Sequence, residues 1–191
     1  MDKTELSLYL HIPFCVKKCD YCDFLSFPVG RDGRTAVEEY VNALCREIET
    51  AGIYRSTAEQ GDEVDIIKKS FPDPGACKVV SIYIGGGTPN IVPAILLEHI
   101  LCKFRDKFDV AENAEISMEL NPGIYTAKNV AGELGILRRA GVNRLSIGLQ
   151  SADDNVLKRL GRIHTFADFE LTFSEARRAG FDNIKADIIY S

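Results

Sequence analysis

The sequence lacks any stretch of about 20 uncharged apolar residues, which is the length that an α-helix needs to cross a bilayer. Its first residues, MDKTELSLYLHIPFC, also lack the apolar core and the small-residue cleavage site of a secretory signal peptide. We therefore expect no membrane span and a cytoplasmic, reducing setting. In such a setting clustered cysteines are more often ligands than halves of disulfides.

An excess of basic charge is also missing. The 191 residues include 23 Lys and Arg against 28 Asp and Glu, so the formal net charge is −5. Proteins that bind nucleic acid usually carry a positive patch or stripe, so we expect no nucleic-acid partner. No low-complexity tract interrupts the chain, and its length is sufficient to bury a core without a disulfide staple.

Short apolar runs alternate with helical patterns along the chain. Thr35 and Glu38 form an expected capping box at the start of the first helix, and Thr165 is the expected cap of the last. The polar stretch 52–77, which contains Gly and Pro, indicates an irregular insertion. Five segments have the length and composition of strands: 6–12, 78–84, 115–120, 143–149 and 183–190. Strands that alternate with helices predict a parallel sheet of βαβ units.

Each predicted strand has one apolar face and one face of small or polar residues. In the first strand Leu8, Leu10 and Ile12 share a face, opposite Tyr9 and His11. A doubly wound sheet would be apolar on both faces, whereas a barrel can turn the polar face toward its lumen. We therefore predict an α/β fold, a partial TIM-like barrel that is truncated after its fifth strand. The polar residues near the C-terminal ends of the strands, where barrel enzymes place their sites, are Tyr9, His11, Glu119, Gln150 and Asp187.

Three cysteines lie in the loop CVKKCDYCDF after the first strand: Cys15, Cys19 and Cys22. Three thiolates can bind three irons of a [4Fe–4S] cluster and leave the fourth iron open for a substrate group. A zinc site with His11 as fourth ligand is the main alternative, and a disulfide is a weaker one. The charged neighbours of these cysteines disfavour a core position. The isolated Cys45, Cys77 and Cys102 are expected to act as small hydrophobic residues.

The spacing CxxxCxxC after a first strand resembles that of the radical S-adenosylmethionine (SAM) superfamily. Five further motifs follow in order: GGGTP (85–89), MELNP (118–122), GVNRLSIGLQS (141–151), LGRIH (160–164) and NIKADIIY (183–190). Together they resemble the oxygen-independent coproporphyrinogen III oxidase-like branch, and especially its haem-chaperone subgroup. The resemblance implies a partial (β/α)6 barrel, with residues 1–191 as an incomplete radical SAM core domain that lacks the sixth strand and the C-terminal domain.

The resemblance also implies roles for single residues. Cys15, Cys19 and Cys22 would ligate the cluster, and the amine and carboxylate of SAM would bind its open iron. The positions that match SAM contacts are Tyr9, Tyr21, Gly86, Gly87, Thr88, Glu119, Gln150, Arg162 and Asp187. Arg162 rests on the resemblance alone, and the alternative for it is a solvated surface charge. Lys185 departs from the pattern, because relatives have a small residue there.

Three functions stay open at this point. The first is a haem chaperone that binds haem and SAM, with an electron donor and haem-receiving proteins as partners. The second is an oxygen-independent coproporphyrinogen III oxidase acting on a porphyrinogen. The oxidases carry a fourth cysteine soon after the third, whereas Asp23 and Phe24 follow Cys22 here, which favours the chaperone. The third is a zinc-stapled or inactive barrel fragment. Five side chains are open as haem ligands: Cys45, Cys77, Cys102, His99 and His164.

Overall fold

The computed structural model describes residues 3–29, 33–51 and 73–190. Its main sheet has five strands: β1 (Thr4–Ile12), β4 (Cys77–Gly86), β5 (Asp109–Leu120), β6 (Arg144–Gln150) and β7 (Asn183–Ile188). They are hydrogen-bonded in the order β1-β4-β5-β6-β7, and every neighbouring pair is parallel. This chain-order sequence of parallel strands is that of an arc of a (β/α) barrel, as predicted.

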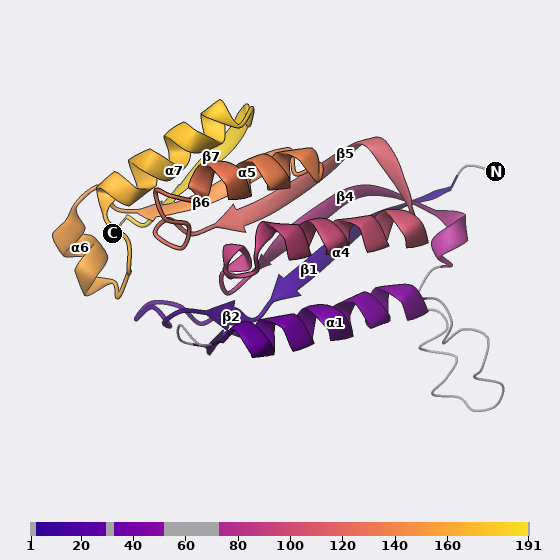
Figure 1. Cartoon of the computed structure of the whole chain (residues 1–191), viewed down its shortest axis with the longest axis horizontal. Helices are drawn as coiled ribbons and strands as arrows, with labels where there is room; N and C mark the ends of the chain where they lie inside the picture. The colour runs from indigo at the N-terminus through magenta and orange to yellow at the C-terminus, as the bar shows by residue number, and fades with distance from the viewer. Residues whose placement is uncertain (1–2, 30–32, 52–72, 191) are drawn as a thin grey trace.

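Helices cover one side of this sheet. They are α1 (Arg34–Thr50), α4 (Ala94–Lys107), α5 (Val130–Arg139) and α7 (Phe166–Arg178). In Figure 1 they lie on the near side of the strands, and α1 packs on α4, α4 on α5, and α5 on α7. None of the helices in the described part of the chain has both the length and the apolar character needed to cross a bilayer.

The core lies between the helices and the apolar faces of the strands. Leu10, Ile12, Ile84, Met118 and Ile147 are buried on the sheet side. The helices contribute an apolar stripe each, with these members: Val37, Val41, Leu97, Ile100, Leu101, Leu134, Leu137 and Ala176. Full burial of one Leu or Ile side chain contributes about 1.5–3 kcal/mol. This stripe-on-sheet packing fixes which strand face points away from the helices.

Short elements surround the C-terminal ends of the strands. They are β2 (Phe14–Cys15), β3 (Phe27–Pro28), the 3₁₀ turn η2 (Pro89–Ile91) and α6 (Asp154–Arg159). Figure 1 shows β2 and α6 at the end of the sheet toward which the arrows of β1 and β5 point. The sequence analysis did not anticipate β2, β3 or α6.

Several local predictions need correction. The first helix begins at Arg34, and its first backbone bond runs from Val37 N to Gly33 O, so Thr35 lies inside the first turn and makes no cap. At the other end of the chain, Thr165 and Asp168 form a complete capping box for α7. Most of the predicted insertion, 52–72, lies outside the described residues. The end of the predicted insertion is not irregular. It forms a 3₁₀ turn, η1 (Pro74–Ala76), which leads directly into β4 at Cys77.

Candidate functional site

The loop that carries the three cysteines is closed at its base by the pairing of β2 with β3. Phe27 N donates to Pro13 O at 2.7 Å, and Val29 N donates to Cys15 O at 2.9 Å. Lys18 Nζ donates to Phe24 O at 3.3 Å across the loop. These bonds hold residues 15–24 as a defined loop at the C-terminal end of β1.

A second segment supports this loop from the far end of the chain. Asp20 N donates to Leu160 O at 3.2 Å, so the loop is tied to the end of α6. Residues that are about 140 positions apart in the sequence therefore lie side by side. The motif LGRIH thus borders the cysteine loop directly.

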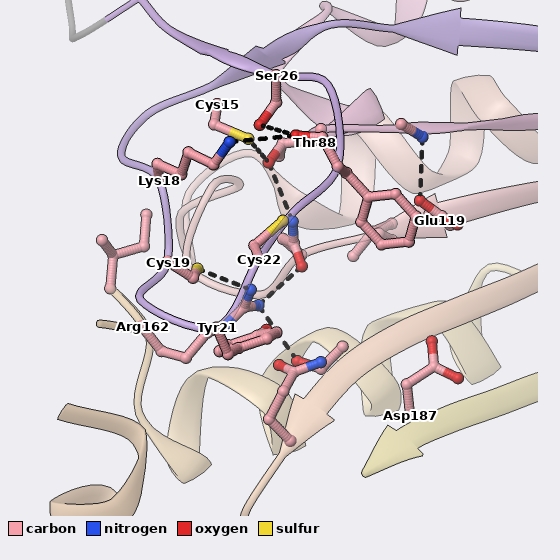
Figure 2. Close-up of a pocket in the computed structure, with 18 of the residues that line it drawn as sticks. Cys15, Lys18, Cys19, Tyr21, Cys22, Ser26, Thr88, Glu119, Arg162 and Asp187 are labelled. Atoms are coloured by element: carbon pink, nitrogen blue, oxygen red, sulfur yellow. Dashed lines mark hydrogen bonds between the residues drawn. The ribbon is translucent and has the colours of Figure 1, made fainter. Parts of the chain in front are cut away.

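A cavity of about 350 Å³ opens between the cysteine loop and the polar face of the sheet. Its wall includes the predicted site residues Cys15, Cys19, Tyr21, Cys22, Gly86, Gly87, Thr88, Glu119, Gln150, Arg162 and Asp187. Figure 2 shows side chains from the loop, β5, β7 and the segment after α6 facing this space. Tyr9 is the predicted residue that is not in the wall. It is 60% exposed and stacks on Tyr83, with ring centroids 6.1 Å apart.

All six cysteines are free thiols. Cys15 is buried, whereas Cys19 and Cys22 are partly exposed toward the cavity. Within residues 3–29, 33–51 and 73–190, no three His, Cys, Asp or Glu side chains are grouped to hold one metal ion. A [4Fe–4S] cluster has a different requirement, because each iron takes a separate cysteine.

His11 does not serve as a spare ligand in this structure. Its Nδ1 is 3.0 Å from the Tyr9 hydroxyl and its Nε2 is 2.9 Å from Leu25 O, so both ring nitrogens are engaged in hydrogen bonds. Of the other cysteines, Cys45 and Cys77 are buried as expected. The expectation is wrong for Cys102, which is exposed on α4.

The glycines of GGGTP bring the backbone against the cysteine loop. Gly86 has φ +118°, a left-handed conformation that favours glycine. A Cβ placed on Gly87 would lie 2.6 Å from Phe14 O and 2.9 Å from Cys15 Sγ. The turn therefore needs glycine at the point where it passes the first cysteine.

Glu119 binds this turn from β5. Its Oε2 accepts from Gly86 N at 3.2 Å, and its Oε1 accepts from the Tyr83 hydroxyl at 2.7 Å. Burial, and then the hydrogen bond to Glu119, raise the pKa of Tyr83 well above its ordinary value, so this hydroxyl stays a donor. Tyr83 lines the cavity but was not predicted as a site residue. Its position on the polar face of its strand was the available signal.

Gln150 carries a buried acceptor that no described residue satisfies. Its side chain is 9% exposed, and its Oε1 has no hydrogen-bond partner among the described residues. It is also the one described non-glycine residue with positive φ, +60°, at the irregularity where the β6–β7 register shifts. Leaving a buried acceptor unpaired costs about 1–3 kcal/mol, so a donor from a bound ligand fits this position.

Arg162 lies in the cavity wall and not on an open surface. Nη2 donates to Asn121 Oδ1 at 2.7 Å, and Nη1 points to Cys19 Sγ at 3.7 Å, as Figure 2 shows. Nε donates to His164 Nδ1 at 3.3 Å, and His164 Nε2 lies 3.3 Å from Leu149 O. Burial, and then the charge of Arg162, lower the pKa of His164 to about 4, so its ring is neutral at pH 7.

Asp187 is engaged by two neighbours on the same face of the sheet. The Ser146 hydroxyl donates to Oδ2 at 2.6 Å, and the Lys185 ammonium lies 2.8 Å from Oδ1. Lys185, which departs from the family pattern, therefore lines the cavity and pairs with Asp187, a predicted SAM contact.

The sequence profile of the radical SAM superfamily matches residues 9–190. The chain belongs to the radical SAM superfamily. The relatives that it matches are longer than this chain. It is 36% identical to the heme chaperone HemW of Escherichia coli over 97% of this chain and 42% of that protein. It is 33% identical to the heme chaperone HemW of Haemophilus influenzae, over 97% of this chain and 43% of that protein.

Coproporphyrinogen oxidases are also similar to this radical SAM chain. The oxygen-independent coproporphyrinogen III oxidase of Synechocystis is 32% identical over 98% of this chain and 35% of that protein. The solved structure of coproporphyrinogen III oxidase (HemN) from Escherichia coli, described as a radical SAM enzyme, superposes with a TM-score of 0.76 at 26% identity. It covers 99% of this chain and 38% of that one. The predicted fold class, a partial radical SAM barrel, is confirmed.

Proposed function

We propose that this chain binds a [4Fe–4S] cluster through Cys15, Cys19 and Cys22 and binds SAM in the adjoining cavity, as the core of a haem chaperone. The observation that carries the proposal is the meeting of the cysteine loop with the glycine turn. Cys15 Sγ and the backbone at Gly87 are so close that no side chain fits between them. Membership of the radical SAM superfamily supplies the identity of the group that such a loop holds.

The cavity also fits the second group, SAM. The unpaired Oε1 of Gln150 can accept from a ligand donor, and the carboxylates of Glu119 and Asp187 can accept from ribose hydroxyls or an ammonium. Arg162 supplies a fixed cation for a carboxylate. Tyr21, on the loop, offers a ring on which an adenine can stack.

When bound and reduced, the cluster supplies one electron for the reductive cleavage of the SAM sulfonium. The chain's own residues hold the ligands and limit the access of water. Glu119 keeps the glycine turn in place through Gly86 N, and Tyr83 keeps Glu119 oriented. Thr88 and Arg162 direct donors to Cys15 and Cys19 respectively.

The haem-chaperone part of the proposal rests on the relatives named HemW and on the sequence after the third cysteine. The oxidases' fourth cysteine is replaced by the Asp23-Phe24 pair. Of the five side chains left open as haem ligands, His99 and Cys102 are exposed, whereas Cys45, Cys77 and His164 are buried. The haem ligand itself, an electron donor and haem-receiving partners stay part of the proposal.

A second candidate is oxygen-independent coproporphyrinogen III oxidase activity. It is favoured by the superposition on the solved oxidase over nearly the whole of this chain. Both candidates use the same cluster and SAM site, so they differ in the second ligand. The zinc-stapled alternative from the sequence analysis differs from both in its metal.

One preparation separates these alternatives. The chain is purified without oxygen, reconstituted with iron and sulfide, and analysed for iron, sulfide and zinc. We expect four irons and four sulfides per chain, haem binding as a Soret shift on titration, and no conversion of coproporphyrinogen III with SAM and reductant. Turnover of coproporphyrinogen would support the oxidase and contradict the chaperone. Stoichiometric zinc in place of iron would contradict both.

A further inference from the structure

Asn121 follows β5 directly and lines the cavity, and none of the roles assigned above belongs to it. Its backbone is held by Asn90, a side chain that is 1% exposed. Asn90 Nδ2 donates to Asn121 O at 2.9 Å, and Asn90 Oδ1 accepts from Asn121 N at 2.9 Å. The position from which the Asn121 side chain reaches into the site is therefore fixed by a neighbouring turn.

The orientation of the Asn121 amide follows from its partners. Arg162 can only donate, so the atom 2.7 Å from its Nη2 must be the amide oxygen. The amide nitrogen then faces Thr88 and donates to its Oγ1 at 3.0 Å. Because that hydroxyl receives a hydrogen bond, its own proton is free for Cys15 Sγ, at 3.5 Å.

Two hydrogen-bonded chains that end on cysteine sulfurs thus meet at this amide, whose Nδ2 donates to Thr88 and whose Oδ1 accepts from Arg162. One chain runs through the Thr88 hydroxyl to Cys15, and the other runs through Arg162 to Cys19, whose Sγ is 3.7 Å from Nη1. Figure 2 shows these interactions as a continuous set of dashed lines around the loop. Four separate segments of the chain contribute to it: the cysteine loop, the turn at Thr88, Asn121 after β5 and Arg162 after α6.

We propose that Asn121 is a positioning residue that directs the Thr88 hydroxyl to Cys15 and the Arg162 guanidinium to Cys19, and thereby sets the reduction potential of the cluster. The inference rests on the proposed function, because it concerns the cysteines as cluster ligands. Donors to ligand sulfurs stabilise the added negative charge of the reduced state, so they raise the potential. Loss of both donor chains should make the cluster harder to reduce.

The network itself is tested in the metal-free chain, where the result does not depend on cluster binding. Urea unfolding is compared for Asn121→Leu, Arg162→Leu and the double variant. Each single variant should raise the unfolding equilibrium constant by some factor relative to wild type. If Asn121 and Arg162 are coupled, the factor for the double variant should be at least threefold smaller than the product of the two single factors. Additive effects would overturn the coupling of Asn121 to Arg162. Asn121→Asp, which keeps an acceptor for Arg162, should retain that coupling.

The effect on the cluster is tested by redox titration of the reconstituted protein without SAM, followed by EPR. Asn121→Leu should bind iron at the wild-type level, with a tenfold higher ratio of oxidised to reduced cluster at a fixed potential, or about 59 mV for one electron. Asn121→Asp should show a smaller shift. An unchanged midpoint in Asn121→Leu would overturn the proposal.

Asn143→Leu is the matched control for lost stability. Asn143 makes a similar clamp, accepting from Ile116 N at 2.9 Å and donating to Ala114 O at 2.8 Å, and it does not line the cavity. It should lower the free energy of unfolding without moving the midpoint. An equal shift in this control would overturn a specific role for Asn121. Failure of the wild-type chain to take up iron would contradict the proposed function, and the urea cycle would still decide the network.

Discussion

The Lys185 ammonium lies 2.8 Å from Asp187 Oδ1, and both side chains line the cavity beside the cysteine loop. The pair is partly exposed, and exposed pairs of this kind contribute about 0.2–1 kcal/mol. The Ser146 hydroxyl occupies the other carboxylate oxygen. A ligand that needs Asp187 therefore competes with Lys185 for Oδ1.

Lys185→Ala should increase the affinity for SAM. Removal of the ammonium frees Asp187 Oδ1 for the ligand. The free energy that an exposed ion pair contributes corresponds to a Kd for SAM that is lower by about two- to fivefold. Equilibrium dialysis with labelled SAM on the reconstituted protein measures this. Lys185→Arg keeps the pair and should leave the Kd unchanged. A higher Kd for SAM in Lys185→Ala would contradict this prediction and would indicate that Lys185 itself contacts SAM.

Gly87→Ala should disturb the loop at the first cysteine. The new Cβ would meet Phe14 O at 2.6 Å and Cys15 Sγ at 2.9 Å, and overpacking of this kind costs about 1–3 kcal/mol. Because the added Cβ displaces the loop at Cys15, the iron content of Gly87→Ala after reconstitution should be lower than that of wild type. Gly132→Ala in α5 is the control, because its Cβ would meet nothing within 4 Å. That change should stabilise the chain by about 0.5–1 kcal/mol, and equal iron content in both variants would count against the close approach.

Gln150→Met should stabilise the metal-free chain and weaken its binding of SAM. The change removes the buried Oε1 that has no partner among the described residues, so the metal-free chain should gain up to about 1 kcal/mol in free energy of unfolding. The same change removes the acceptor that we propose for SAM, so the Kd for SAM should rise. Denaturant unfolding and SAM binding give the two readings. A variant that is less stable and binds SAM normally would show that Oε1 has an internal partner.

The pH dependence of stability should contain a contribution from His164. Its pKa is lowered to about 4 in the folded chain, whereas an unfolded histidine titrates near 6.5. Between these values the unfolded chain binds more protons, so the folded state loses stability as the pH falls. The loss from pH 7 to pH 5 is about 2 kcal/mol for this residue. Urea unfolding of the metal-free protein at both pH values measures it.

His164→Asn is the comparison for this loss. The variant has no ionisable group at 164, so the difference in stability between pH 7 and pH 5 should shrink by about 2 kcal/mol relative to wild type. A pH profile identical to that of the wild type would show that His164 is not buried in neutral form.

The sheet could be predicted from the sequence because apolar residues alternate with small or polar ones along the central part of each strand. Leu10 and Ile12, buried against the helices, and Tyr83, exposed on the other face, follow that alternation. The start of β5 was missed because Glu112 and Asn113 have no apolar alternation and belong to a polar extension of the strand. Thr35 was misread as a cap because a capping box is a local pattern, and the helix entry is set by Gly33.

The residues of the cavity wall could be predicted where they belong to a recognisable motif, and they were missed where only contacts in the fold single them out. Cys15, Gly87 and Arg162 belong to motifs that resemble those of a known family. The sequence analysis did not single out Asn121, which directly follows the predicted strand 115–120, and its partners Thr88 and Arg162 lie 33 and 41 positions away. Only the fold brings these three together, so no spacing rule could have joined them. The unpaired state of Gln150 Oε1 is likewise a property of packing.

The most direct test of the account is the EPR spectrum of the anaerobically reconstituted, reduced chain with and without SAM. The account predicts a [4Fe–4S]⁺ signal that changes shape when SAM is added, because SAM binds the open iron. The signal should be lost when Cys15, Cys19 or Cys22 is replaced by Ala, and it should persist in Cys45→Ala. A signal that SAM leaves unchanged, or a cluster that survives loss of all three loop cysteines, would contradict it.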